Sequence, residues 1–250
     1  MKPFFAALSF LTLVRVPVAW CGDESDLCRS LSWYAAVGLF IGIGMALLDQ
    51  VLCALLPGTL LPSALLVVAL VAVSGGLHLD GVADSADAFM SSRERDAMLH
   101  IMQDSRIGAM GALSIASLLL LKFSALASLI GAARWGVIVL IPLAGRTALV
   151  LPLVMLPYAR PGGLAELTRQ QARPHHAWSA AALLLLSATL LLHLGGTIIA
   201  ATVLLITLLF GRYCHNKIGG FTGDTLGATC ELAELSTVVV ALLVVHTGGV

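Results

Sequence analysis

Long runs of hydrophobic residues, broken by short polar segments, dominate this sequence. Seven of these runs approach the roughly 20 residues that a helix needs to cross a bilayer. They lie at residues 33–56, 59–79, 108–130, 135–156, 177–194, 197–210 and 226–245. No strand-like alternation is evident, and open sheets cannot span a bilayer. The pattern predicts an all-α, polytopic integral membrane helical bundle with about seven transmembrane helices, formed by residues 1–250 as a single domain.

Two parts of this pattern are irregular. The fifth and sixth segments are joined only by Gly195-Gly196, which predicts a tight turn. At the N-terminus, residues 4–14 are apolar, but Arg15 and Pro17 follow without a small-residue cleavage site. We therefore expect an uncleaved interfacial or re-entrant segment whose helix ends at Pro17.

Composition supports a membrane protein and leaves the thiols free. The chain is 59% hydrophobic and only 11% charged, whereas soluble domains are about 25% charged. Its five cysteines form no Cys-x-x-Cys pair, and their odd number excludes complete internal pairing. We interpret them as free thiols.

The distribution of basic residues predicts the orientation. With seven spans, the N-terminal region and residues 80–107, 158–176 and 212–225 share one side. Their basic residues are Lys2, Arg15, Arg29, Arg93, Arg95, Arg106, Arg160, Arg169, Arg173, Arg212 and Lys217. The opposite loops hold Arg134 alone, and Lys122 and Arg146 fall inside spans. The basic side is therefore predicted to be cytoplasmic and the C-terminus to face outward. Arg146 either points into a polar cavity or marks a misplaced boundary.

A short acidic motif follows the second hydrophobic segment. Asp80, Asp84 and Asp87 lie within eight residues, in a chain with only 14 acidic residues. On a helix these positions fall within about 60° of one another. Carboxylates so close repel, so we expect a cation among them. Oxygen ligands favour a hard ion, which predicts a site for Mg²⁺, with Mn²⁺ as the alternative ion. The competing interpretation is a solvated loop.

A second polar segment, GGFTGDTLGATCELAE at residues 219–234, precedes the last span. Asp224 and Glu231 are seven residues apart and share a helical face. We expect Asp224 to be a metal ligand, and Glu231 to be a ligand, a base or an acceptor behind the site. Glycines at positions 219, 223 and 227 permit close approach of another backbone or of a phosphate. A helix-packing strip and a phosphate-binding segment are therefore both open interpretations. Gly220, Thr222 and Gly223 are candidate substrate-binding residues.

Acids and arginines on one side of a membrane suit phosphoryl transfer, because carboxylates hold divalent ions and arginines neutralise phosphate charge. Arg93 and Arg160 are candidate substrate-binding residues, although a single arginine there is more often a topology or headgroup residue. Arg106 lies beside Asp104 where the third span begins, and both are candidate catalytic residues.

Five blocks spread along the chain form a recognisable set. They read FFAALSFLTLVRVPV, GGLHLDGVADSADAF, MQDSRIGAMGAL, YARPGGL and GGFTGDTLGATCELAE. Together they resemble the cobalamin synthase family, adenosylcobinamide-GDP ribazoletransferase, over essentially the whole chain. The pairing of H-x-D-G-x-x-D-x-x-D with G-G-x-T-G-D-x-L-G-A is the most specific part. Residues 88–92 lack the extra glycines that many members carry there.

The resemblance implies transfer of the adenosylcobinamide-phosphate group from adenosylcobinamide-GDP to α-ribazole or its 5′-phosphate, with release of GMP. It also implies Mg²⁺ dependence and a place in the prokaryotic cytoplasmic (inner) membrane, with membrane lipids but no nucleic acid as partners. Asp80, Asp84 and Asp87, with Asp224, would hold one or two ions on the pyrophosphate. A homo-oligomer and association with other nucleotide-loop assembly enzymes are further expectations. Gly38-x-x-x-Gly42 is a candidate dimer seam.

The attacking ribose hydroxyl needs a proton acceptor. His78 is a candidate base, and a hydrogen-bond donor to Asp80 or to the backbone is an equally weighted alternative. Asp104, Glu231 or one aspartate of the acidic motif are the other candidate bases.

Two rival functions remain. A CDP-alcohol phosphotransferase would use the same metal chemistry, but its D-x-x-D-G-x-x-A-R order is absent. A transporter would also carry acids near the membrane, but no repeated halves are visible.

Overall fold

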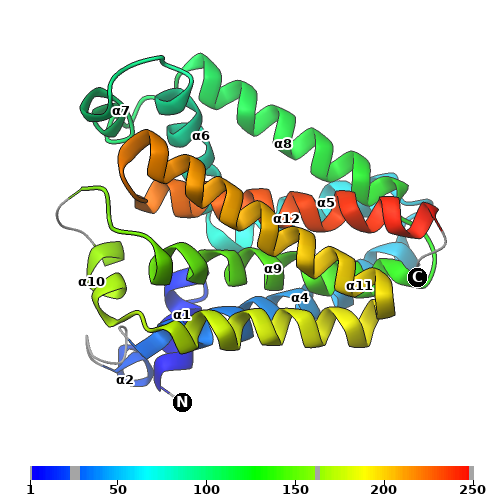
Figure 1. Cartoon of the computed structure of the whole chain (residues 1–250). Helices are drawn as coiled ribbons and strands as arrows, with labels where there is room; N and C mark the ends of the chain where they lie inside the picture. The colour runs from blue at the N-terminus through cyan, green and yellow to red at the C-terminus, as the bar shows by residue number, and fades with distance from the viewer. Residues whose placement is uncertain (1, 23–28, 161–163, 248–250) are drawn as a thin grey trace.

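The computed structural model of the protein describes residues 2–22, 29–160 and 164–247. Its helices are α1 (Lys2–Leu11), α2 (Val18–Cys21), the 3-10 helix η1 (Ser30–Trp33), α4 (Tyr34–Leu55), α5 (Leu60–Ser74), α6 (Leu77–Phe89), α7 (Arg95–Ile101), α8 (Ala109–Ser128), α9 (Ala133–Met155), α10 (Leu164–Gln171), α11 (Pro174–Ile218) and α12 (Gly223–His246). The long helices run alongside one another, and α7 and α10 lie at the same end of the bundle (Figure 1). The predicted all-α bundle is confirmed.

Within the residues that the structure describes, five helices are long and apolar enough to cross a membrane, or six if α5 and α6 form one bent span. The 45-residue α11 is two helices, because Leu192 and His193 leave the helical region between them. Figure 1 shows its two arms running in opposite directions and diverging from this break. Near the break they are so close that a Cβ on Gly196 would lie 1.8 Å from the carbonyl oxygen of Ala188. These arms are the predicted fifth and sixth segments, and the multi-pass membrane architecture is confirmed.

The predicted span over residues 59–79 is wrong in its last five residues. α5 ends at Ser74, and α6 begins at Leu77 with an axis turned by 89°. Gly75 and Gly76 form the bend with φ values of 63° and 78°, which favour glycine. The acidic motif therefore lies on a short helix of its own, as the helical spacing of its acids predicted, and not in a solvated loop.

The N-terminal helix also differs from the prediction. It ends at Leu11, and Pro17 instead precedes the first residue of α2. The Leu13 backbone N–H donates to the carbonyl oxygen of Val73 at 2.8 Å. The Leu13 side chain covers the α5–α6 bend, where a Cβ on Gly75 would lie 2.7 Å from it. The N-terminal segment is thus attached to the bend that carries the acidic motif.

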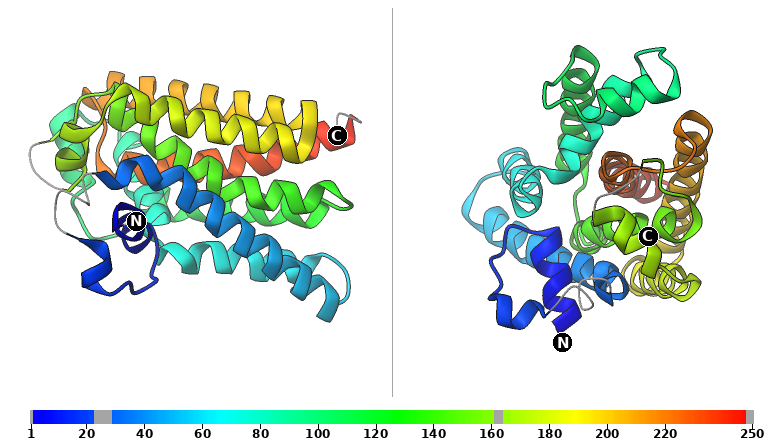
Figure 2. Two further views of the ribbon diagram at one scale, coloured as in Figure 1. Left: turned by 90° about the horizontal axis from the view of Figure 1, so that it is seen from below. Right: turned by 90° about the vertical axis from the view of Figure 1, so that its left-hand side faces the viewer.

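α9 is the central helix, with 94% of its apolar stretch buried (Figure 2). Gly38 and Gly42 of α4 pack directly on it: Cβ atoms there would lie 2.6 Å and 2.1 Å from the carbonyl oxygens of Pro142 and Val139. The predicted dimer seam is therefore wrong, because both glycines contact a helix of the same chain. Cys21, Cys53, Cys214 and Cys230 are free thiols, and Cys28 lies outside the described residues.

Arg134, predicted in an outer loop, is buried at the start of α9. Its guanidinium donates two hydrogen bonds to the Asp49 carboxylate of α4, at 2.9 and 2.7 Å. It also donates to the Ser63 hydroxyl of α5 at 3.1 Å and to the Leu129 carbonyl after α8 at 3.0 Å. One side chain therefore joins α4, α5, α8 and α9.

Replacing Asp49 with alanine should destabilise the protein strongly. Removing one partner of a buried pair leaves an uncompensated charge, which costs about 3–5 kcal/mol. The midpoint of thermal unfolding in detergent should therefore fall sharply. The control is the double variant Asp49→Leu with Arg134→Met, which removes both charges and should lower the midpoint much less. An unchanged midpoint for the single variant would show that this ion pair does not hold the four helices together.

Candidate active site

The site is built where α6 and α12 cross in close contact. A Cβ on Gly81 would lie 2.5 Å from the carbonyl oxygen of Asp224, and one on Gly227 would lie 3.2 Å from the Cα of His78. Only residues without a side chain allow two backbones to approach so closely. This crossing brings Asp80, on α6, beside the first turn of α12.

The three glycines of the polar segment at residues 219–234 have different roles. Gly227 packs the two helices, in agreement with the packing interpretation. Gly219 ends α11 with a left-handed φ of 80° and belongs to no helix strip. Gly223 opens α12, and a Cβ there would meet nothing within 4 Å. Of the three, only Gly223 faces open space.

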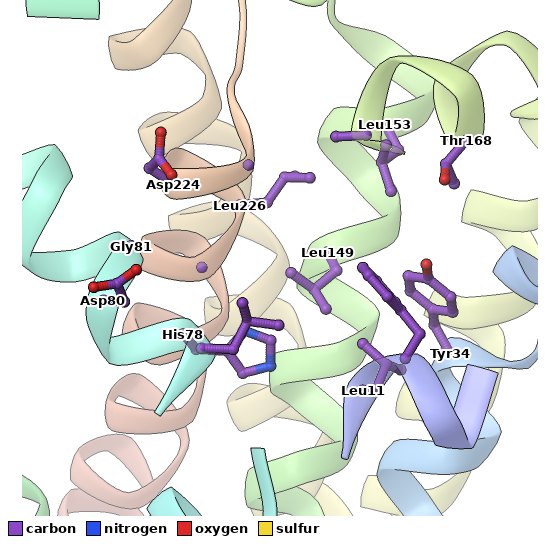
Figure 3. A pocket seen from close by; sticks show the side chains of 15 residues that line it. Leu11, Tyr34, His78, Asp80, Gly81, Leu149, Leu153, Thr168, Asp224 and Leu226 are labelled. Carbon is purple, nitrogen blue, oxygen red and sulfur yellow. The ribbon is translucent and has the colours of Figure 1, made fainter. Parts of the chain in front are cut away.

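Two cavities meet at the acids. The larger, of about 970 Å³, is lined by Asp80, Asp84, Asp104 and Asp224. The smaller, of about 180 Å³, lies on the other side of Asp80 and Asp224 and includes His78. Figure 3 shows Asp80 and Asp224 on one side of the smaller cavity and Tyr34 and Leu11 on the other. Asp80 and Asp224 are therefore shared by both cavities.

The carboxylates of Asp80, Asp84 and Asp224 suit a hard divalent ion. Asp80 and Asp84 make no side-chain hydrogen bond or ion pair with any residue that the structure describes, and the charges of Asp80 and Asp224 both act on Asp84. Oxygen-only donors match the preference of Mg²⁺. Within the described ranges, however, no three acidic, histidine or cysteine side chains form a ready ligand group. Mg²⁺ usually keeps waters and substrate phosphates beside one or two carboxylates, so the donor chemistry fits.

Asp87, the fourth predicted ligand, makes a structural contact. Its two carboxylate oxygens accept the backbone N–H groups of Gly108 and Gly111, at 2.7 and 2.8 Å. These amides open α8, where a carboxylate is favourable. A Cβ on either glycine would lie 2.4 Å from the carboxylate. Asp87 thus joins α6 to α8, and it lines neither cavity.

Arg160 reaches the site through a short pairing of two loops. The Phe221 N–H donates to the Pro157 carbonyl at 3.0 Å, and the Ala159 N–H donates to the Phe221 carbonyl at 2.8 Å. Gly220 allows this approach, because a Cβ there would lie 2.1 Å from the Pro157 oxygen. The Arg160 Nη2 then lies 3.3 Å from the Asp224 carboxylate. Its Nη1 is buried and has no hydrogen-bond partner in the described part of the chain.

Thr222 caps α12 and holds Asp224. Its hydroxyl accepts the Thr225 N–H at 3.2 Å and lies 3.2 Å from the Asp224 carboxylate, to which it can donate. Thr222 is fully buried, so its contacts are with the protein. Gly220 and Thr222, predicted to bind substrate, therefore shape the loop that positions Asp224.

The Asp104–Arg106 pair lies at the rim of the larger cavity. The Arg106 guanidinium donates to Asp104 at 2.6 Å, and both groups are solvent-exposed. Hydrogen bonds from the Arg106 side chain and backbone lower the pKa of Asp104 to about 2, so this carboxylate stays ionised and is a weak base. Arg93 is exposed and lines neither cavity.

Glu231 belongs to a buried ion cluster and not to the cleft. Its carboxylate accepts a hydrogen bond from Lys122 of α8 at 2.7 Å, and Glu234 accepts one from the same ammonium at 2.8 Å. Glu234 also pairs with Arg146 of α9. Two acids and two cations thus balance one another between α8, α9 and α12. Arg146 faces this polar cluster, which was one of the two expected alternatives.

His78 lies between the cleft and this cluster. It is 3% exposed, and its Nε2 makes no hydrogen bond within the described residues. It lines the smaller cavity with Asp80 and Asp224. Sequence reasoning found His78 but not Phe10, Tyr34, Leu149 and Leu153, which complete this cavity. The only signal for Phe10 was the apolar N-terminal block, and the other three residues lie in hydrophobic spans, where hydropathy alone does not indicate a site.

These features define a multi-pass helical membrane protein with an acid-lined cleft at one end of its bundle. The chain belongs to the cobalamin-5-phosphate synthase family, whose sequence model matches residues 3–243. It is 39% identical over 233 residues to the adenosylcobinamide-GDP ribazoletransferase of Roseiflexus sp. (strain RS-1), covering 93% of this chain and 86% of the relative. It is 39% identical over 241 residues to the protein of the same name from Pseudomonas putida (strain GB-1), covering 95% and 97%. No solved structure matches the chain.

Placing a methyl group at the crossing should disrupt the site. In Gly81→Ala, the new Cβ would meet the Asp224 carbonyl at 2.5 Å, so α6 must move away from α12. Displacing catalytic groups by about 1 Å costs roughly a hundredfold in kcat. The matched control is Gly44→Ala on α4, where a Cβ meets nothing within 4 Å and alanine favours the helix. Equal activity of the two variants would contradict the role of this contact.

Proposed function

We propose that this protein transfers the adenosylcobinamide-phosphate group from adenosylcobinamide-GDP to α-ribazole, or to α-ribazole 5′-phosphate, and releases GMP. The observation that supports this most directly is the convergence of Asp80, Asp84 and Asp224 with Arg160 beside two cavities that share two of those acids. The relatives named above carry the name of this activity. A transfer between two large substrates needs two spaces that meet at the reacting phosphate.

The bond changes of this reaction can be assigned to the site. A ribose hydroxyl oxygen attacks the phosphorus that bears the cobinamide, the new P–O bond forms, and the bond to GMP breaks. Arg160 would bind a phosphate oxygen through its unpartnered Nη1. His78 is our candidate acceptor for the hydroxyl proton, because the residue lines the smaller cavity and its Nε2 has no hydrogen-bond partner among the described residues.

The acids would hold the metal. Asp80, Asp84 and Asp224 are the proposed ligands of Mg²⁺, with Mn²⁺ as a substitute, and Asp87 would support them by fixing α6 against α8. The ion would supply charge neutralisation on the pyrophosphate. Glu231 would act from behind the site, because Lys122 already occupies its carboxylate.

Asp84→Asn should therefore abolish most turnover. We expect a fall in kcat of at least about a hundredfold, or roughly 2.7 kcal/mol of transition-state stabilisation. The kcat is measured from the release of GMP when purified protein is mixed with adenosylcobinamide-GDP, α-ribazole and Mg²⁺. The control is Asp96→Asn, an exposed acid on α7 whose side chain is 91% accessible and whose loss should change little.

Wild-type Mg²⁺ dependence in a folded Asp84→Asn variant would contradict the metal assignment. Absence of GMP release by the wild-type protein under every divalent ion would instead contradict the proposed activity.

We also propose that the protein resides in the cytoplasmic membrane with its site facing the cytoplasm. The predicted cytoplasmic arginines Arg95, Arg106 and Arg160 lie near the site, whereas Arg134 at the other end is neutralised by Asp49. Figure 1 shows the N- and C-termini at opposite ends of the bundle. Oligomers and association with other enzymes of the same assembly stay predictions.

Reporter fusions test this orientation. A fusion after Arg106 should report the cytoplasm, and a fusion at the C-terminus should report the outside, because the positive-inside rule fixes the basic end. A fusion after Gly131, between α8 and α9, should agree with the C-terminal one. If the Arg106 and C-terminal fusions report the same compartment, the chain crosses the membrane an even number of times between them and the proposed topology is wrong.

A further inference from the structure

The smaller cavity differs in chemistry from the larger one. Apart from the residues it shares with the cleft, its walls are mostly aliphatic or aromatic, and Leu11, Leu149 and Leu153 are each under 5% exposed. The larger cavity is instead edged by Ser9, Thr12, Gln103, Asp104 and Ser105. A small, mostly apolar space and a larger space with both polar and apolar walls thus open on the same two acids.

An aromatic pair forms part of the smaller cavity. Phe10 of α1 and Tyr34 of α4 stack with ring centroids 6.0 Å apart and an angle of 29° between their planes. Phe10 also lines the larger cavity, so its ring stands where the two spaces meet. Stacked aromatic walls favour a flat aromatic ligand, which gains contact area and ring–ring interaction.

The two proposed substrates differ in what they can place in such a space. The donor carries a corrin ring, far larger than about 180 Å³, and a guanine whose donors and acceptors need polar partners. The acceptor carries one flat aromatic base with few hydrogen-bonding groups, attached to the ribose whose hydroxyl must reach the acids. In Figure 3, Asp80 and Asp224 lie on the opposite side of this cavity from Tyr34. A base bound between Tyr34 and Leu153 would therefore place its ribose near the two acids.

We propose that the smaller cavity, walled by Phe10, Tyr34, Leu149 and Leu153, is the subsite for the aromatic base of the nucleoside acceptor, and that the larger cavity takes the donor. This inference rests on the proposed function. Leu149 and Leu153 of α9 would then set the size of base that the enzyme accepts.

Filling the subsite should affect one substrate only. Leu153→Phe should raise the KM for α-ribazole roughly tenfold or more, since a pocket discriminates by about that factor per misplaced methylene-sized group. The KM for adenosylcobinamide-GDP should stay within about twofold. The matched control is Leu151→Phe, two residues away on the same helix, similarly buried and lining a different cavity. It should change neither KM.

Two further measurements separate the possible failures. Equilibrium dialysis of α-ribazole against detergent-solubilised protein with EDTA tests the subsite without turnover, and Leu153→Phe should weaken that binding by the same factor. Leu153→Ala, which enlarges the space, should instead accept a nucleoside with a bulkier aromatic base than wild type does.

A rise in the donor KM for Leu153→Phe, or unchanged acceptor binding in both Leu153 variants, would overturn the subsite. If the wild-type protein binds α-ribazole with this dependence on Leu153 but never releases GMP, the subsite stands and the proposed reaction fails.

Discussion

The close contact between α6 and α12 is the constraint on which the site depends. The acids lie on helices separated by more than 130 residues, and neither helix alone provides more than part of the ligand set. The missing side chains of Gly81 and Gly227 let the two backbones touch. Two further contacts position groups at this crossing. Thr222 caps the start of α12, and the paired loops bring Arg160 to Asp224. Two small residues therefore decide whether the carboxylates share one cavity.

Buried charge holds the rest of the bundle around this crossing. In hydrocarbon, helix association gains little from burial of apolar surface, so packing and polar contacts determine which helices meet. Arg134 joins four helices at one end, and Lys122 joins α8 to α12 nearer the site. Such pairs are costly to bury, but removing one partner costs more. Their value here is that they specify neighbours among otherwise similar apolar helices.

Periodicity and hydropathy predicted the helical bundle, and helix geometry correctly placed Asp80 and Asp84 on one helix. They did not predict contacts between distant segments. Asp87 lies on the same helical face as Asp80 and Asp84, so its spacing predicted the same role. It instead caps α8, because the first residues of α8 lie beside it. Glu231 shares a helical face with Asp224, but it lies deeper along α12 and pairs with Lys122. The sequence alone did not indicate a partner for Lys122. The bend at Gly75-Gly76 was hidden because the residues around it are as apolar as a span.

The pairing of Lys122 and Arg146 with acids of the last helix bears on how the chain is made. α8 and α9 are synthesised before α12, so both cations must enter the bilayer before Glu231 and Glu234 exist. An unpaired charge at membrane depth costs several kcal/mol and draws water or lipid headgroups inward. α8 and α9 therefore gain the acids that compensate their buried cations only after α12 has been made. The segment that completes the cleft thus also neutralises the two buried cations of the bundle.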